Sequence, residues 1–203
     1  MKIKENQHFN HWFYNHPYLL SAISFIVVFA LAILIAQKDL TINKEKELQK
    51  SEEILDAVEV NINHILNSSY VTTLSLALTI DTEGNPQNFE QVAAKLYESN
   101  ENIDGLELVP NGVVQYVYPY EENKGAIGLN ILKYKYSQKE AYKAIESRKM
   151  YFAGPLRFKQ GGFGIIGRLP VFVEDEFWGY SAVMIKLETF LEKSGINELE
   201  KKV

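Results

Sequence analysis

The stretch KQGGFGIIGRLPVFV, residues 159–173, decides the fold. It contains a G-x-G-x-x-G pattern at Gly162, Gly164 and Gly167. In dinucleotide-binding proteins this pattern lies between a strand and a helix whose N-terminus faces the pyrophosphate. Here RLPVFV follows the last glycine, and its proline would break a helix that began there. The sequence therefore predicts a hairpin without a nucleotide site, in which Gly161 and Gly162 form the turn and residues 163–173 form the returning strand.

The segments around this hairpin predict an alternation of helices and antiparallel strands. Breaker residues and apolar periodicity place helices at 88–99 and 137–148, a loop at 121–130, and strands at 103–109, 113–118, 151–158, 163–173 and 177–187. Ser137 with Glu140 three residues later predicts a capping box at the start of the second helix. The expected fold class is α+β, a PAS-like antiparallel five-stranded sheet with covering helices.

An uncharged apolar run at Tyr18–Ala36 precedes these elements. It is close to the roughly 20 residues that a helix needs to cross a bilayer. We expect an uncleaved transmembrane helix at 18–36. A cleaved signal peptide is the alternative, although its apolar core is shorter and its cleavage site has small residues. Lysines flank the run on both sides, so the positive charges do not decide its orientation. We take residues 1–17 as a cytoplasmic tail, because a long C-terminal part is usually translocated.

Residues 37–80 predict a stalk helix, because no proline or glycine lies between Asp39 and Thr79. Its apolar seam repeats every seven residues, as in helices that pair, and consists of Leu48, Ser51, Leu55, Val58, Ile62, Ile65, Ser69, Thr72 and Leu76. For residues 44–65 the seam favours a homodimer through the stalk. For residues 70–80, packing on the same chain's core is an equal alternative. Residues 81–197 form the expected PAS-like globular domain, and residues 198–203 are interpreted as the start of a truncated C-terminal helix.

The composition argues against several functions. The net charge of −5 gives no basic surface for nucleic acid, and the absence of cysteine excludes disulfides and thiolate metal sites. His8, His11 and His16 precede the apolar run, and His64 stands alone on the stalk. A catalytic triad or a histidine metal site inside the globular part is therefore not expected, and neither is a cofactor.

Six short motifs of the globular part resemble, in order and spacing, the CHASE domain. They are IDGLELVPNGVVQYVYP at 103–119, AIGLN at 126–130, Ala141-x-x-Ala144, GPLRF at 154–158, GFGIIGRLPVF at 162–172 and WGY at 178–180. The resemblance implies a ligand-sensing domain outside the membrane on a helical stalk, which serves as the input of histidine kinases, diguanylate cyclases and plant cytokinin receptors. The positions aligned with two cytokinin contacts are Ser137 and Arg168. Neither carries the residue type of those receptors, so the resemblance argues against an adenine-type ligand.

Arg168 is the main candidate ligand-binding residue. Strand alternation places it among apolar neighbours on one face, and an unpaired buried guanidinium costs several kcal/mol. A ligand carboxylate or phosphate is one partner for it, and an internal salt bridge to Glu107, Glu146 or another acid is the other, slightly favoured interpretation. The remaining ligand-binding candidates are Ser137, from the alignment, and aromatic residues that either line the same cavity or belong to the core: Tyr116, Tyr118, Tyr151 and Phe172.

These features together predict a periplasmic or extracellular sensor domain anchored in the cell inner membrane by one span. We expect it to bind a small molecule, with an anion as one candidate, and to report to the output domain of a longer receptor, with a sensor histidine kinase as the first choice. The alternatives are the input domain of a diguanylate cyclase or chemoreceptor, and a membrane-tethered scaffold without ligand. The fragment itself is not expected to be an enzyme.

Overall fold

The computed structural model describes residues 17–159 and 161–197. The chain divides into two compact units, residues 1–54 and 55–203. Helix α2 begins at Pro17 in the first unit and ends at Ala77 in the second. Residues 21–38 of α2 are long and apolar enough to cross a membrane. The predicted tail at 1–17 and the predicted helix at 198–203 lie outside the described residues, apart from Pro17, the first residue of α2.

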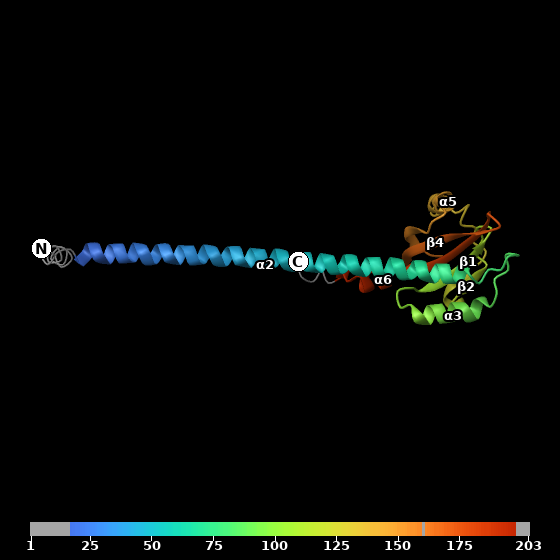
Figure 1. Cartoon of the computed structure of the whole chain (residues 1–203), viewed down its shortest axis with the longest axis horizontal. Coiled ribbons are helices and arrows are strands. Elements are labelled where there is room, and N and C mark those ends of the chain that lie inside the picture. Colours follow the sequence, from blue (N-terminus) through green and yellow to red (C-terminus); the bar gives the residue numbers. More distant parts are fainter. Residues whose placement is uncertain (1–16, 160, 198–203) are drawn as a thin grey trace, which may run out of the picture. The chain divides into compact units, whose positions relative to one another are not determined.

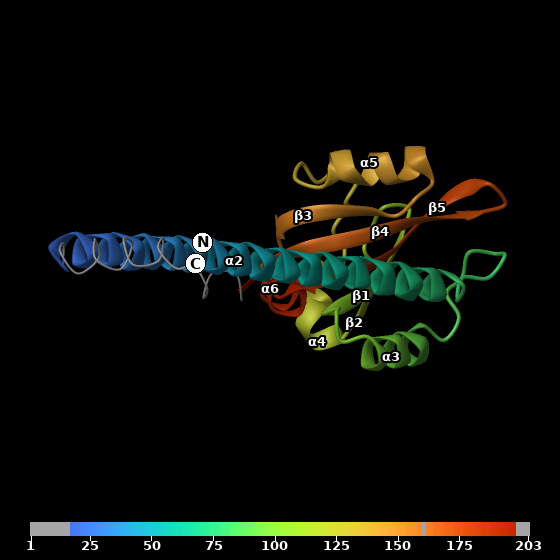
Figure 2. The ribbon, with the colours of Figure 1, turned by 60° about the vertical axis from the view of Figure 1, so that its left-hand side comes forward.

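The second unit contains a five-stranded antiparallel sheet, which confirms the predicted fold class. Its elements, coloured along the chain in Figure 1, are α3 (Phe89–Ser99), β1 (Gly105–Pro110), β2 (Tyr116–Tyr118), α4 (Tyr120–Asn123), the short 3-10 helix η1 (Lys124–Ala126), α5 (Gln138–Ser147), β3 (Tyr151–Arg157), β4 (Phe163–Val173), β5 (Glu176–Lys186) and α6 (Leu187–Ser194). The strand order is β2-β1-β5-β4-β3, so the last strand occupies the centre. Helix α5 covers one side of the sheet, and α2 and α3 lie away from it, on the other side (Figure 2).

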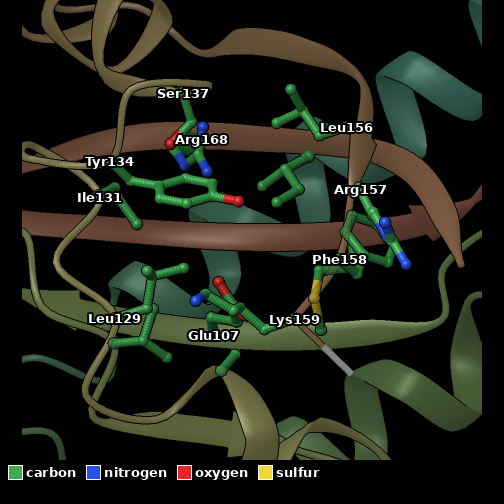
Figure 3. Close-up of a pocket in the computed structure, with 14 residues that line it drawn as sticks. Glu107, Leu129, Ile131, Tyr134, Ser137, Leu156, Arg157, Phe158, Lys159 and Arg168 are labelled. Carbon is green, nitrogen blue, oxygen red and sulfur yellow. The ribbon is translucent and has the colours of Figure 1, made fainter. Parts of the chain in front are cut away.

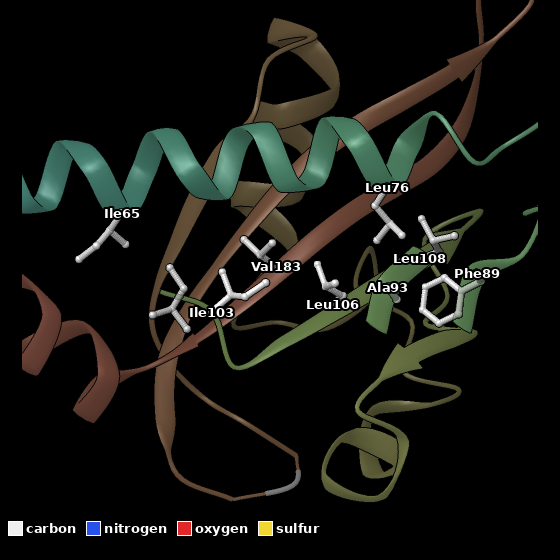
Figure 4. Packing of buried hydrophobic residues seen from close by; sticks show 9 residues of the cluster. Ile65, Leu76, Phe89, Ala93, Ile103, Leu106, Leu108 and Val183 are labelled. Atoms are coloured by element: carbon white, nitrogen blue, oxygen red, sulfur yellow. The ribbon is translucent and has the colours of Figure 1, made fainter. Parts of the chain in front are cut away.

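The face of the sheet toward α2 and α3 carries the larger apolar core. Ile65 and Leu76 of α2 point toward the sheet and share one cluster with Leu106 of β1 and Val183 of β5, which Phe89 and Ala93 of α3 extend (Figure 4). A buried hydrogen bond of 2.7 Å joins the Ser181 hydroxyl of β5 to the main-chain oxygen of Thr73 in α2. The C-terminal part of α2 is thus joined to the central strand by both apolar and polar contacts.

Much of the seam expected to pair stalk helices is buried within a single chain. Five of its members, Val58, Ile65, Ser69, Thr72 and Leu76, are at most 9% exposed within a single chain. These residues are not available to a second helix, so of the two interpretations the structure supports intrachain packing for 70–80 and extends it back to Val58. Leu48 and Leu55 of the seam are exposed. A homodimer through α2 stays a prediction, and its contacts must come from exposed positions such as these.

The opposite face of the sheet is covered by α5 and by the segment between β2 and α5. Tyr180 of β5 is fully buried there and donates a 2.8 Å hydrogen bond from its hydroxyl to the main-chain oxygen of Ala141. The same cluster includes Val109, Ala126, Ile131 and Ala144. The cavity described below lies on this face, beneath the segment between β2 and α5.

Local details confirm some sequence predictions and correct others. Gly161 and Gly162 form the hairpin turn with positive φ, and β4 has the predicted limits. The capping box is wrong, because the Ser137 side chain makes no cap hydrogen bond and is buried in the core. Part of the predicted loop at 121–130 is helical, as α4 and η1, and α6 replaces the end of the last predicted strand.

Candidate functional site

One row of residues runs across the whole sheet on the face covered by α5. In the strand register Val117 of β2 lies opposite Glu107 of β1, Glu107 opposite Ala182 of β5, Ala182 opposite Arg168 of β4, and Arg168 opposite Tyr151 of β3. Residues directly opposite one another in a sheet share a face. The row therefore places an acid and a base on either side of the methyl group of Ala182.

A cavity lies over this part of the row. Its volume is about 30 Å³, and it is lined by Glu107, Val114, Ala126, Leu129, Ile131, Tyr134, Ser137, Leu156, Arg157, Phe158, Lys159, Ile166, Arg168 and Met184. In Figure 3, Tyr134 and Ser137 lie toward the same end of the cavity as Arg168, and Glu107 lies toward the opposite end. The volume admits one or two water molecules. A molecule of several non-hydrogen atoms therefore needs a wider arrangement of the surrounding segments.

Two of the predicted site residues reach this cavity with unsatisfied polar atoms. Arg168 is 3% exposed, and its Nε and Nη1 atoms have no hydrogen-bond partner; the buried Oγ of Ser137 also has none. Buried polar groups in folded proteins are nearly always hydrogen-bonded, because an unsatisfied one costs free energy. A ligand acceptor group that bonds to such buried, unsatisfied donors therefore gains more binding free energy than it would from donors that already have partners.

Glu107 is the second buried ionisable group in the cavity. It is 3% exposed, and burial raises the pKa of its carboxyl group to about 7, although the charge of Arg168 acts in the opposite direction. Burial also lowers the pKa of Arg168. None of the ion pairs within the described residues joins these two side chains. The predicted internal salt bridge of Arg168, to Glu107, Glu146 or another acid, is therefore not among the ion pairs of the described residues. Arg168 and Glu107 still influence each other's pKa across the cavity.

The remaining charged groups at the cavity are cationic and lie at its edge. Arg157 and Lys159 are exposed residues at the end of β3 and in the turn that follows. The Nζ atom of Lys159 lies 5.7 Å from the centroid of the Tyr134 ring. The site thus combines a cationic edge with one buried arginine and one buried carboxyl group, and this charge distribution favours a ligand with at least one anionic group.

The aromatic candidates are not brought together at the cavity. Tyr116 and Tyr118 lie on the opposite face, where their rings pack against Phe89 and Tyr97 at centroid distances of 5.4 and 5.6 Å. Tyr151 lies in the row with Arg168 but not among the lining residues, and its hydroxyl accepts a hydrogen bond from Lys143. Phe172 packs against Phe177 and under the guanidinium of Arg148, also outside the cavity.

Sequence reasoning treated Glu107 only as a possible salt-bridge partner and did not select Tyr134 or Lys159. One signal for Glu107 was available, since it is the only charged residue in the apolar strand GLELVP, residues 105–110. A carboxyl group in the middle of such a run is buried at a cost unless something pairs with it. Nothing in the local sequence around Tyr134 or Lys159 distinguishes them from ordinary loop residues.

Comparison with known protein families tests the resemblance to the CHASE domain. A family model described as the CHASE domain matches residues 111–202, which confirms the resemblance for this part of the chain. No curated protein matches the sequence.

Several solved sensory domains have a similar fold. The ligand-binding domain of the Pseudomonas aeruginosa amino acid chemoreceptor PctC, in complex with GABA, is 18% identical with a TM-score of 0.55, over 70% of this chain and 65% of that one. The sensory domain of the Campylobacter jejuni chemoreceptor Tlp3 is 13% identical with a TM-score of 0.57, over 73% and 64%. The sensor domain of the V. cholerae histidine kinase DctB is 19% identical with a TM-score of 0.51, over 74% and 60%. This chain spans less than two thirds of each of these structures, and identities this low establish the fold alone.

Proposed function

Because residues 111–202 match the CHASE domain, we propose that this chain is the extracytoplasmic input domain of a membrane-anchored receptor that senses a small anionic molecule. One observation carries the proposal: the buried guanidinium of Arg168 faces a cavity with two nitrogen atoms that have no partner. A carboxylate or phosphate beside the guanidinium offers acceptor oxygens for charge-assisted hydrogen bonds from such donors. The apolar segment at residues 21–38 supports the membrane anchor, with the sheet domain in the periplasm or outside the cell.

Ligand binding in this proposal shifts an equilibrium between two arrangements of the domain. The cavity of about 30 Å³ represents the closed arrangement, in which a metabolite does not fit. Binding therefore requires Tyr134, Leu129 and Lys159 to move outward, and it stabilises that wider arrangement. The free energy available for signalling is the difference in the ligand's affinity for the two arrangements.

The sheet offers a direct route from the cavity to α2. Ala182 of β5 lies on the same face of the sheet as the cavity, which Met184 of β5 lines. The neighbours of Ala182, Ser181 and Val183, face α2, where Ser181 donates a hydrogen bond to Thr73. A displacement of β5 therefore changes contacts on both sides of the sheet. We assign the receptor to the sensor histidine kinases as first choice, with a diguanylate cyclase or a chemoreceptor as the alternatives. A homodimer through exposed positions of α2, such as Leu48 and Leu55, completes the proposal.

A thermal-shift experiment tests the ligand site. The full chain in detergent micelles is heated with a panel of small carboxylates and phosphates at millimolar concentration, together with the variants Arg168→Met and Arg148→Met. Arg148 is the matched control, because it is an exposed arginine that pairs with Asp175 outside the cavity. We expect at least one anion to raise the melting temperature of the native chain and of Arg148→Met, and not of Arg168→Met. An equal shift in all three proteins refutes a role for Arg168.

A membrane-tethered scaffold without ligand is the second candidate, and the small volume of the cavity favours it. The same panel separates the two. A scaffold gives no stabilisation by any anion, and its Arg168→Met variant is at least as stable as the native chain, since replacing a buried unpaired charge by a side chain of similar volume removes a cost.

A further inference from the structure

The charged residues at the cavity suit a ligand that carries a positive group as well as a negative one. Arg168 and Glu107 lie two strand spacings apart, which places their Cα atoms about 10 Å from each other with only Ala182 between them. Both side chains extend from the same face of the sheet and are long enough to meet over Ala182. They form no ion pair within the described residues, and the cavity lies between them.

A ligand with a single negative charge pairs with only one of these two buried residues. Its carboxylate pairs with Arg168 but leaves the carboxyl group of Glu107 buried without a donor, and an ionised Glu107 then faces a second anion. A ligand with a carboxylate at one end and an ammonium group at the other pairs with both residues. Each buried charge then has a partner of opposite sign, and the interior of the site stays neutral.

We infer that the cavity binds a small zwitterion, an amino acid, whose carboxylate pairs with Arg168 and Ser137 and whose ammonium group pairs with Glu107. This inference rests on the proposed ligand site and specifies the chemical class of its ligand. It adds Glu107 as the residue that distinguishes an amine-bearing acid from a plain acid. Tyr134, Leu129 and Ile131 provide the apolar walls that exclude water from these pairs.

Binding of a zwitterion changes the protonation of Glu107. Near neutral pH Glu107 is partly protonated in the empty site, because burial raises the pKa of its carboxyl group to about 7. An ammonium group beside it favours the ionised form, so binding of an amino acid releases a proton. A plain carboxylate has the opposite effect, since a second negative charge favours protonated Glu107 and binding takes up a proton.

Other ionisable groups also face the site. They are Arg168 on β4, Arg157 and Lys159 at the edge, Tyr134 in the covering segment, Tyr180 on β5 and Glu140 on α5. Glu107→Gln keeps every one of them, so the part of the proton change at pH 7 that this variant loses belongs to Glu107.

Isothermal titration calorimetry with matched ligand pairs tests the inference on the full chain in detergent micelles. The pairs differ only by an ammonium group: L-alanine and propionate, L-norvaline and valerate, 4-aminobutyrate and butyrate. Two cationic buffers of different ionisation enthalpy give the number of protons exchanged, and they avoid buffer anions that compete for Arg168. We expect the amino member of at least one pair to bind about tenfold more tightly than its partner and to release about half a proton at pH 7.

Variants separate this inference from the proposed function. In Glu107→Gln we expect the preference for the amino member to fall below about threefold and the proton release to disappear. Arg168→Met should bind neither member of any pair. If the plain carboxylate binds as tightly as the amino acid, or if binding takes up a proton, the zwitterion is excluded while an Arg168-dependent anion site stands. If no member binds at millimolar concentration, the zwitterion is likewise excluded, and the anion panel described above decides the proposed function separately.

Discussion

Replacing Glu107 with glutamine removes a buried titrating group and keeps its shape, so the effect on stability can be calculated. The pKa of the Glu107 carboxyl group is raised from 4.5 to about 7 by burial. One pKa unit corresponds to about 1.4 kcal/mol, so the free energy of unfolding contains a contribution of about 3 kcal/mol that depends on pH. Because the folded chain holds the proton more tightly than the unfolded chain, this contribution is complete below pH 4.5 and is lost as pH rises to about 7.

We therefore expect the native chain and Glu107→Gln to be about equally stable at pH 4.5, without ligand. At pH 8 the variant should be more stable by about 3 kcal/mol. For a unit of this size that difference corresponds to roughly 6–12 °C in melting temperature. The assay is thermal unfolding of the full chain in detergent micelles at half-unit steps between pH 4.5 and 8, followed by circular dichroism. Glu98→Gln, at an exposed position on α3, is the control and should follow the native curve.

Two results would refute the reasoning. Parallel curves for the native chain and Glu107→Gln would mean that the carboxyl group is solvated rather than buried. A variant less stable at pH 8 by several kcal/mol would mean that Glu107 is ionised and paired with Arg168, because breaking a buried ion pair leaves an uncompensated charge.

Three further predictions concern the elements that hold the site in place, and each is checked by thermal unfolding. Ser181→Ala removes the buried hydrogen bond from β5 to α2 and should cost about 1 kcal/mol, or roughly 2–4 °C. Tyr180→Phe removes the hydrogen bond from β5 to α5 and should cost a similar amount, with faster amide hydrogen exchange confined to α5. Gly179→Ala should cost more than about 3 kcal/mol, because its φ is +155° and the added Cβ would clash with the main-chain oxygen of Val109. Gly128→Ala, where the added Cβ meets nothing, is the control and should cost only about 1 kcal/mol.

The sequence predicted the hairpin of β3 and β4 well because residues typical of turns lie at both ends of β4. Gly161 and Gly162 supply positive φ at one end of β4, and Glu174 and Asp175 adopt positive φ at the other. Between them, alternation correctly placed Arg168 on the face with Gly164, Ile166 and Pro170. Such features are local, so one sequence suffices to find them.

The arrangement of the site depends on contacts between distant parts of the chain, and these were not predicted. Glu107 and Arg168 share a row only because β5 lies between β1 and β4, and no local pattern specifies that order. The same register turns Tyr116 and Tyr118 toward α3, although an aromatic residue in a strand suits either face. The stalk seam had the same ambiguity, since a heptad stripe on α2 serves equally for a second helix or for the chain's own sheet.

The central position of β5 is what makes the proposed sensor physically plausible. Alternate residues of a strand face opposite sides of its sheet, so a ligand that moves Ala182 also moves Ser181 and Val183. On that second side the Ser181 hydroxyl is bonded to the main chain of α2, and Val183 packs in the cluster that contains Ile65 and Leu76. Close-packed interiors resist small volume changes, so the α2 face cannot absorb a shift of β5 without repacking. If Ser181→Ala leaves ligand affinity unchanged but removes the ligand's effect on hydrogen exchange in residues 65–77, then coupling runs through this bond; an undiminished effect would assign it to the apolar contacts instead.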